Sequence, residues 1–203
     1  MIILREAIKL TRDFYDKTKP YNDFSGYEEH VISVGACASI LAAACSLDVM
    51  KAGIMGYCHD IGKMIKDERK TKTFHGLTGY DYFKSVGEDE LAQICLTHSF
   101  PNTDFRMEEY ISYGEDNIKR VQSILKDVKY TDYDRIIQLS DLMVNFDGYA
   151  VFYENLKGRM NYIEKEYHVE HQHIRTKYKN AIRLKRYFEK KYNCNIYKLL
   201  GIK

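Results

Sequence analysis

The sequence predicts an all-α fold, a compact bundle of many helices with additional helices at its C-terminal end. Apolar residues recur at three- and four-residue steps in one segment after another, which is the period of an amphipathic helix. Only two of the 203 residues are proline, so helices can continue over long stretches. No alternating apolar run is followed across an Asn-Gly or Asp-Gly turn by a second such run, as a β-hairpin would require.

The first half of the chain contains five predicted helices. The first is amphipathic, and the second is apolar on most of its faces, so we expect the second at the centre of the bundle. Asp48 is a suitable N-cap for the third helix, from which the chain leaves through Ile61-Gly62-Lys63 into a charged loop. Gly87 separates the fourth helix from the fifth. These helices span residues 1–17, 27–46, 49–59, 77–86 and 88–97.

The second half continues the helical pattern after residues 101–113, which are expected to form a loop with a helical turn. Asp132 is the predicted N-cap of a helix with a stripe of Ile and Leu. We expect one domain over residues 1–203, with its core at about 27–144 and a helical extension at about 147–203. The four predicted helices of this half span residues 115–127, 133–144, 151–167 and 174–192.

Charge and composition narrow the class of protein. The formal charge is only +2, from 31 basic and 29 acidic side chains, which argues against nucleic-acid binding by the whole surface. Basic residues concentrate at positions 175–191, where a solvated helix face and contact with a phosphate-rich partner are both open interpretations. The five cysteines include no C-x-x-C pair, and an odd count without a secretory leader predicts reduced thiols in the cytoplasm. No window approaches the roughly 18 apolar residues of a membrane span.

Histidines and carboxylates form the main functional pattern. Four histidines of the first half lie at or near the ends of separate apolar helical segments, namely His30, His59, His75 and His98. Helix ends are where a bundle can bring side chains from several elements into one pocket. Asp60 follows His59 directly, and Asp141 lies at the polar edge of an apolar helix. Because imidazole nitrogens and carboxylate oxygens together chelate divalent metals, a metal site is predicted.

The ordered set of His30, His59-Asp60 and Asp141 resembles the HD superfamily of metal-dependent phosphohydrolases. The segment Gly56-Tyr57-Cys58-His59-Asp60-Ile61-Gly62-Lys63 is similar to the HDIG(K) form of its signature, and the resemblance covers about residues 27–144. The resemblance implies that the four residues of the ordered set hold one divalent transition metal ion. Mixed nitrogen and oxygen ligands suit iron, manganese, cobalt, nickel or zinc.

Two further motifs resemble those of family members that bind two metals. These are Phe74-His75-Gly76-Leu77-Thr78-Gly79 and Leu96-Thr97-His98-Ser99. The resemblance implies that Asp60 bridges both ions and that His75 and His98 complete the second site. The alternative is a single ion, with both histidines acting in catalysis or in phosphate contact.

The resemblance implies hydrolysis of a phosphoester or phosphoanhydride bond in a small, possibly nucleotide, substrate by metal-activated hydroxide. Asp60 and Lys63 are the predicted catalytic residues. Lys63 resembles a lysine that reaches substrate phosphate, although an exposed loop lysine is the alternative, and Arg106 is a weaker candidate for phosphate contact. Two other functions stay open: an HD-fold di-iron oxygenase, and a non-catalytic nucleotide-binding sensor.

Three more histidines, His168, His171 and His173, follow an H-x-x-H-x-H pattern near the basic segment. On a helix the first two would share a face while the third points elsewhere, and no cysteine lies near them. An exposed cluster is therefore expected in preference to a structural metal site.

Overall fold

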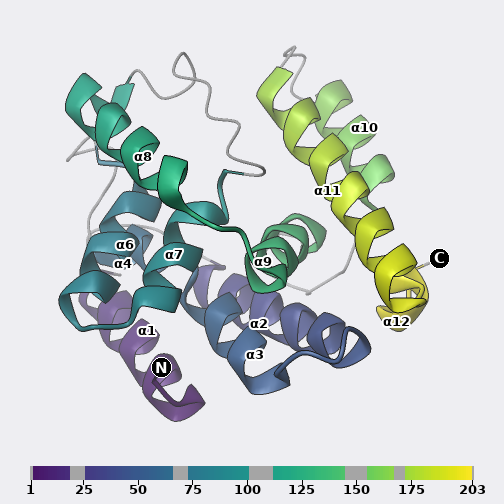
Figure 1. The fold of residues 1–203 in the computed structure, drawn as a ribbon, viewed down its shortest axis with the longest axis horizontal. Helices are drawn as coiled ribbons and strands as arrows, with labels where there is room; N and C mark the ends of the chain where they lie inside the picture. The colour runs from purple at the N-terminus through teal and green to yellow at the C-terminus, as the bar shows by residue number, and fades with distance from the viewer. Residues whose placement is uncertain are drawn as a thin grey trace.

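The computed structural model describes residues 2–18, 26–65, 73–100, 112–144, 155–166 and 172–202. Regular secondary structure within these ranges is helical and includes no strand, so the predicted all-α class is confirmed (Figure 1). The helices are α1 (Leu4–Thr18), α2 (Tyr27–Ala44), α3 (Val49–Cys58), α4 (Gly62–Ile65), α6 (His75–Ser85), α7 (Asp89–Thr97), α8 (Glu115–Asp127), α9 (Asp132–Met143), α10 (Leu156–Glu166), α11 (Gln172–Tyr192) and α12 (Ile196–Leu199).

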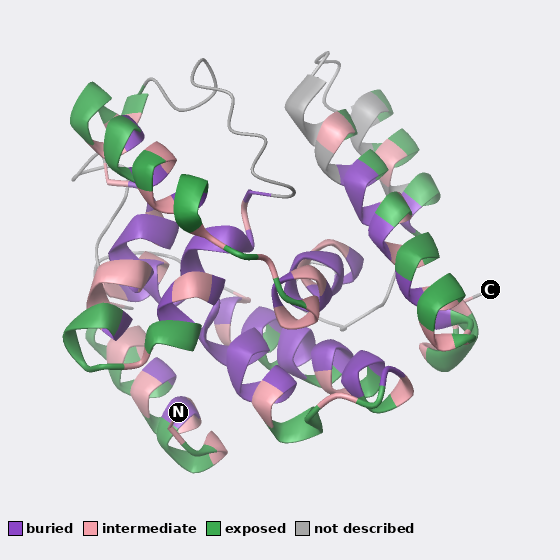
Figure 2. Cartoon of the chain, viewed as in Figure 1, coloured by how far each residue is buried: buried purple, intermediate pink, exposed green. Residues whose placement is uncertain are grey.

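Helix α2 lies at the centre of the bundle, as its apolar composition predicts. It packs against α3 and α9, and Figure 2 shows that buried residues concentrate on these helices and on α7. The backbones of α2 and α3 approach so closely that a Cβ on Gly56 would lie 2.7 Å from the Cα of Gly35. The small residues of both helices thus bring the end of α3, where His59 follows, next to the start of α2.

One of the two predicted helix caps is confirmed and the other is wrong. The Asp48 side chain accepts a hydrogen bond of 3.0 Å from the backbone N–H of Lys51, as an N-cap does. Helix α9, however, is capped by Thr131 and not by Asp132. Thr131 has the extended backbone of a cap, and its hydroxyl accepts from the N–H of Asp134 in a capping box.

Asp132 instead attaches α11 to the start of α9. Its carboxylate accepts hydrogen bonds from Lys191 at 2.7 Å, from Tyr192 at 2.6 Å and from Tyr187 at 3.0 Å. Partial burial alone would raise the pKa of Asp132, but these three donors outweigh it and lower the pKa to about 2. The C-terminal helices are therefore anchored to the same helix that carries Asp141 near its other end.

Two short helices were not predicted. Helix α4 forms where the sequence suggested that the chain leaves α3 as a loop, and α12 follows α11. Each is four residues long, which is too short to produce a periodic apolar pattern. Helix α6 begins at His75, two residues before its predicted start. None of the helices in the described ranges has the length and apolar character needed to cross a membrane.

Candidate metal centre

Six side chains from five helix ends converge inside the bundle. One lies in the first turn of α2, two directly after α3, one at the first position of α6, one directly after α7 and one in the last turn of α9. They are His30, His59, Asp60, His75, His98 and Asp141. These are the six residues that the sequence predicts to form a metal site. The first and the last of them, His30 and Asp141, are more than a hundred positions apart in the sequence.

The first group gathers around one oxygen of Asp60. The Oδ2 atom lies 3.5 Å from the Nε2 of His59 and 3.7 Å from the Nε2 of His30. The Oδ1 of Asp141 completes this group, at 3.2 Å from His30 and 3.7 Å from His59. Two imidazole nitrogens and two carboxylate oxygens therefore surround one small volume.

The second group gathers around the other oxygen of Asp60. Its Oδ1 lies 3.2 Å from the Nε2 of His75 and 3.3 Å from the Nε2 of His98. The two imidazole nitrogens are 3.1 Å apart. Asp60 thus belongs to both groups, with one oxygen directed to each, and within each of the triads His30–His59–Asp60 and Asp60–His75–His98 the donor atoms lie within 4.8 Å of one another.

Backbone carbonyls orient two of the imidazoles. The Nδ1 of His59 lies 2.7 Å from the carbonyl oxygen of Gly56, and the Nδ1 of His98 lies 3.3 Å from that of Ile94. When Nδ1 carries the proton and donates it to such a carbonyl, Nε2 keeps its lone pair for a ligand. The helix end therefore supplies both the histidine and the carbonyl that orients it.

Burial and charge set the protonation of the site. Asp60 is 2% exposed, and burial alone would raise its pKa, but the charges of Lys63 and His59 outweigh this effect and hold the pKa well below its usual range. Burial lowers the pKa of His98 to about 4, so its imidazole is neutral near pH 7. Burial would also lower the pKa of His59, but the carboxylates of Asp60 and Asp141 outweigh it and raise that pKa.

The residues fit a divalent cation. The Nε2 of His59 is fully buried and has no hydrogen-bond partner, although burying a polar nitrogen without one is unfavourable. A cation between this nitrogen and the two carboxylates would satisfy all three groups. Histidine nitrogens with carboxylate oxygens are also the donor set that transition metals accept in proteins.

Lys63 lies beside the site on α4. Its Nζ is 2.5 Å from the Oδ2 of Asp60, and its side chain is 25% exposed, so it is not the fully exposed loop lysine of the alternative interpretation. Arg106 lies outside the described residues, as do His168, His171 and the side chain of His173.

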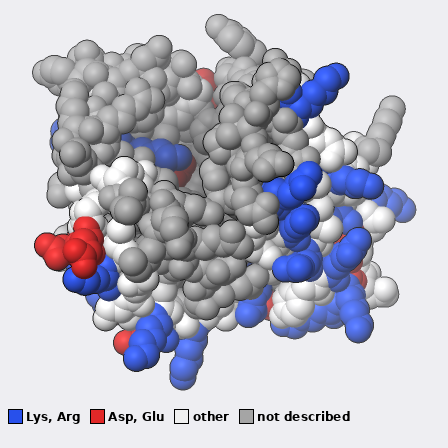
Figure 3. Space-filling model, turned by 90° about the horizontal axis from the view of Figure 1, so that it is seen from above, with Lys and Arg blue, Asp and Glu red and all other residues white. Residues whose placement is uncertain are grey.

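The basic C-terminal stretch lies on one side of the molecule. Figure 3 shows Lys and Arg side chains gathered on the side where α10 and α11 lie. Part of this charge is neutralised within the structure, because Lys185 pairs with Glu189 at 2.8 Å and Lys191 pairs with Asp132. The remaining described basic residues of the stretch are exposed, which agrees with both a solvated face and contact with a phosphate-rich partner; they include Lys179, Arg183, Arg186 and Lys190.

A buried polar network that the sequence did not predict connects α7 to α9. The carboxylate of Asp134, 1% exposed, accepts from the Thr97 hydroxyl at 2.7 Å, from Gln93 at 3.0 Å and from the backbone N–H of Thr131 at 2.7 Å. The amide of Gln138 donates to the carbonyl oxygen of Thr97 at 2.8 Å. This network fixes the end of α7, where His98 follows, against the helix that carries Asp141.

Replacing Asp134 with Ala is expected to lower the free energy of unfolding by about 2–4 kcal/mol, because several buried donors lose their acceptor. Urea unfolding of both proteins measures the difference. The matched control is Asp127→Ala, which removes an exposed carboxylate and should change stability by less than about 0.5 kcal/mol. Equal effects of the two substitutions would contradict the role given to the network.

The fold and the cluster together define an all-helical protein with a buried histidine–aspartate site suited to metal. A family model described as HD domain matches residues 27–144. Because this match covers more than half of the 203 residues, the chain belongs to the HD domain family, a family of metal-dependent hydrolases. No curated protein and no solved structure gives a significant match to the chain.

Proposed function

We propose that this chain is a metal-dependent phosphohydrolase that cleaves a phosphoester or phosphoanhydride bond of a small, nucleotide-like substrate. The observation that supports this most strongly is the position of Asp60, whose two oxygens face two different groups of histidines. A carboxylate in this position is suited to bridge two cations. Two-metal sites are a common means of hydrolysing phosphate esters, since two cations can stabilise the attacking and the leaving oxygen.

In this proposal the first cation is held by His30, His59, Asp60 and Asp141, and the second by Asp60, His75 and His98. Divalent cations bound there would polarise phosphoryl oxygens and lower the pKa of water. The chain itself contributes a buried cluster, in which Asp60 and three of the histidines are at most 3% exposed. Charges act more strongly in such buried surroundings than in bulk water.

The more exposed members of the site indicate where a substrate would enter. His75 and Asp141 retain 12% and 11% exposure of their side chains, and Lys63 retains 25%. His75 and Lys63 contact the Asp60 carboxylate, and Asp141 contacts His30 and His59 beside it, so we expect solvent to approach the cluster from the side of these side chains. In the proposal, the substrate phosphate approaches along this side, where the Lys63 ammonium can bind a non-bridging oxygen as a point charge.

The test is metal analysis of the purified protein, followed by assays against phosphomonoesters, phosphodiesters and nucleotides with the identified metal restored. Release of phosphate or of a nucleoside monophosphate under anaerobic conditions supports the proposal. Consumption of dioxygen without phosphate release would favour the di-iron oxygenase. Saturable nucleotide binding without turnover, with each of several metals, would favour the sensor.

Replacing Lys63 with Met is expected to reduce kcat/KM for the phosphate substrate by about 10–1,000-fold, because one charge that stabilises the phosphoryl oxygens is lost. The bound metal content should stay unchanged, since Lys63 is not one of the proposed metal ligands. Steady-state kinetics and metal analysis measure the two quantities. The control is Lys84→Met, at an exposed lysine paired with Asp89, which should retain full activity. Unchanged kinetics in Lys63→Met would remove this lysine from the mechanism.

A further inference from the structure

The outward face of the central helix is apolar. Apart from Glu29 in the first turn, the exposed positions of α2 within its length are Ile32, Ala36, Ile40 and Ala43. Ile32 and Ile40 are 41% and 37% exposed. A helix that is apolar on all sides is normally buried on all sides. The inward face of α2 carries His30 and the core, whereas none of the described helices covers its outward face.

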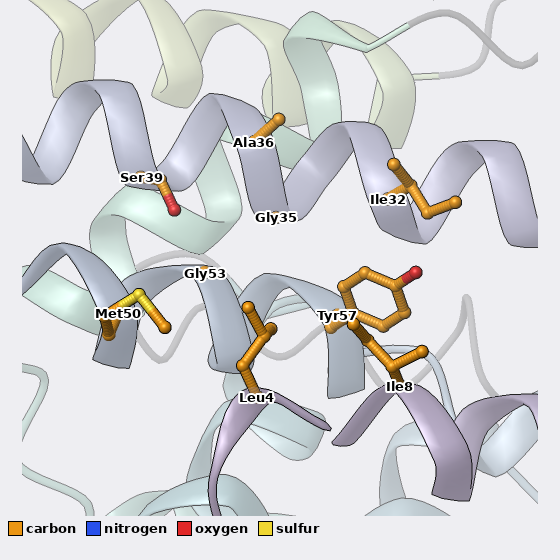
Figure 4. Close-up of a pocket in the computed structure, with 9 residues that line it drawn as sticks. All are labelled: Leu4, Ile8, Ile32, Gly35, Ala36, Ser39, Met50, Gly53 and Tyr57. Carbon is orange, nitrogen blue, oxygen red and sulfur yellow. The ribbon is translucent and has the colours of Figure 1, made fainter. Parts of the chain in front are cut away.

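Neighbouring elements extend this apolar surface. Val49 and Met50 are among the exposed large hydrophobic residues of the described chain, and both lie beside α2. A groove of about 200 Å³ runs beside α2, with α3 and α1 on its other side (Figure 4). Its α2 side is formed by Ile32, Gly35, Ala36 and Ser39, so a row of side chains lies directly beside a depression.

The exposed row of α2 is symmetric about Ala36. Ile32 and Ile40 lie four positions before and four positions after Ala36, and all three residues are exposed. Two antiparallel copies of α2 related by a two-fold axis at Ala36 would therefore place Ile32 of each copy against Ile40 of the other. Such a self-complementary surface is what a symmetric dimer requires.

We infer that this face is a homodimer interface in which α2 packs against α2 of a second copy, with the two-fold axis at Ala36. Residues 32, 36 and 40 form a row along the i±4 direction, and rows of this kind pack into the grooves of a facing helix in the most common type of helix contact. The small side chain at position 36 permits close approach at the crossing point. The groove beside the row gives the Ile40 side chain of the second copy a place to insert.

Charge is compatible with this pairing. Glu29 is the only charged side chain exposed on the α2 face, and it lies seven positions from Ala36. The two-fold axis places the two Glu29 side chains at opposite ends of the contact, about 20 Å apart at 1.5 Å per residue. Because the row offers only a few large apolar side chains for burial, we expect association at micromolar concentrations.

Cysteine cross-linking tests the position of the axis. Four of the five native cysteines are buried and the fifth is partly buried, so the chain has no fully exposed thiol of its own. In Ala36→Cys, the new thiol lies on the axis and meets its own copy, and mild oxidation should give a covalent dimer. Val86→Cys places a thiol at a position that is 55% exposed and distant in sequence from the patch, and it should remain mainly monomeric.

Sedimentation of the unlabelled full chain tests the association itself. The chain is expected to dimerise by about 100 µM, and Ile40→Glu should weaken the dimer at least tenfold, a change of about 1.4 kcal/mol. Val86→Glu adds the same charge elsewhere and should dimerise like the unmodified chain. A chain that stays monomeric at this concentration would overturn the inference. So would a dimer that Ile40→Glu leaves intact, or Ala36→Cys cross-linking no better than Val86→Cys.

Discussion

Asp60→Ala is expected to abolish turnover and metal loading while the chain stays folded. The substitution removes both oxygens around which the two groups of histidines gather, and no other described carboxylate lies between these groups. The proposed bridging ligand is then absent from both metal positions. We expect hydrolytic activity to fall by at least about 1,000-fold, since removing a residue on which the whole site depends typically has an effect of this size or larger.

Three separate readouts test Asp60→Ala. They are the metal content after dialysis, the circular dichroism spectrum, and hydrolysis of the best substrate from the panel. The matched control is Asp81→Ala, which removes an exposed carboxylate paired with Arg120 and should preserve activity and metal content. Full activity of Asp60→Ala, purified free of contaminating phosphatases, would refute the assigned site. Loss of the helical signal would instead show that Asp60 is needed for folding.

Gly62→Ala is expected to be the most destabilising glycine-to-alanine change among the described residues. A Cβ at this position would lie 1.9 Å from the carbonyl oxygen of His75 and 2.8 Å from the backbone nitrogen of Gly79. Both neighbours are backbone atoms of α6, so no side-chain rotation can relieve the overlap. Either α4 or the start of α6 must move, and we expect a loss of at least about 3 kcal/mol of unfolding free energy.

Thermal and urea unfolding measure this effect, and Gly158→Ala provides the control. The Cβ added at Gly158 meets only the Cβ of Asn155, at 4.0 Å, in the exposed part of α10. Because Ala favours helix more than Gly does, this control should be neutral or stabilise the chain by up to about 1 kcal/mol. Equal stability of Gly62→Ala and the unmodified chain would contradict the close packing of α4 against α6.

The close approach of α6 to Gly62 explains why the sequence motif has glycine at this position. Gly62 is the third position after His59, in the segment that resembles the HDIG signature. In the structure, the absence of a side chain at Gly62 allows α6 to approach α4, and the first residue of α6 is His75. The glycine therefore positions one of the histidines of the site.

Long periodic segments were predicted well from the sequence. Helix α8 has the bounds that its periodic pattern predicts, and α2 occupies the central position expected of a helix apolar on most faces. The same pattern could not tell which side of α2 would be exposed, because apolar residues occupy every side. Helices α4 and α12 were missed because one turn cannot produce a period.

The polar interior was harder to predict than the histidine cluster. Thr131 and Asp132 are both common N-cap residues, and only the backbone angles of the folded chain select Thr131. Asp134 and Gln138 are polar types that usually lie at the surface, so their burial between α7 and α9 has no signal in the local sequence. The histidines were recognisable because their order along the chain, and not their local environment, carries the pattern.

The most direct test of the central claim is an anomalous difference map from crystals grown with Mn²⁺, or with the metal found in the purified protein. We expect one peak surrounded by His30, His59, Asp60 and Asp141, and a second between Asp60, His75 and His98. A single peak at the first position would retain the site with one ion. Absence of any peak at Asp60, in crystals that bind the metal elsewhere, would contradict the account.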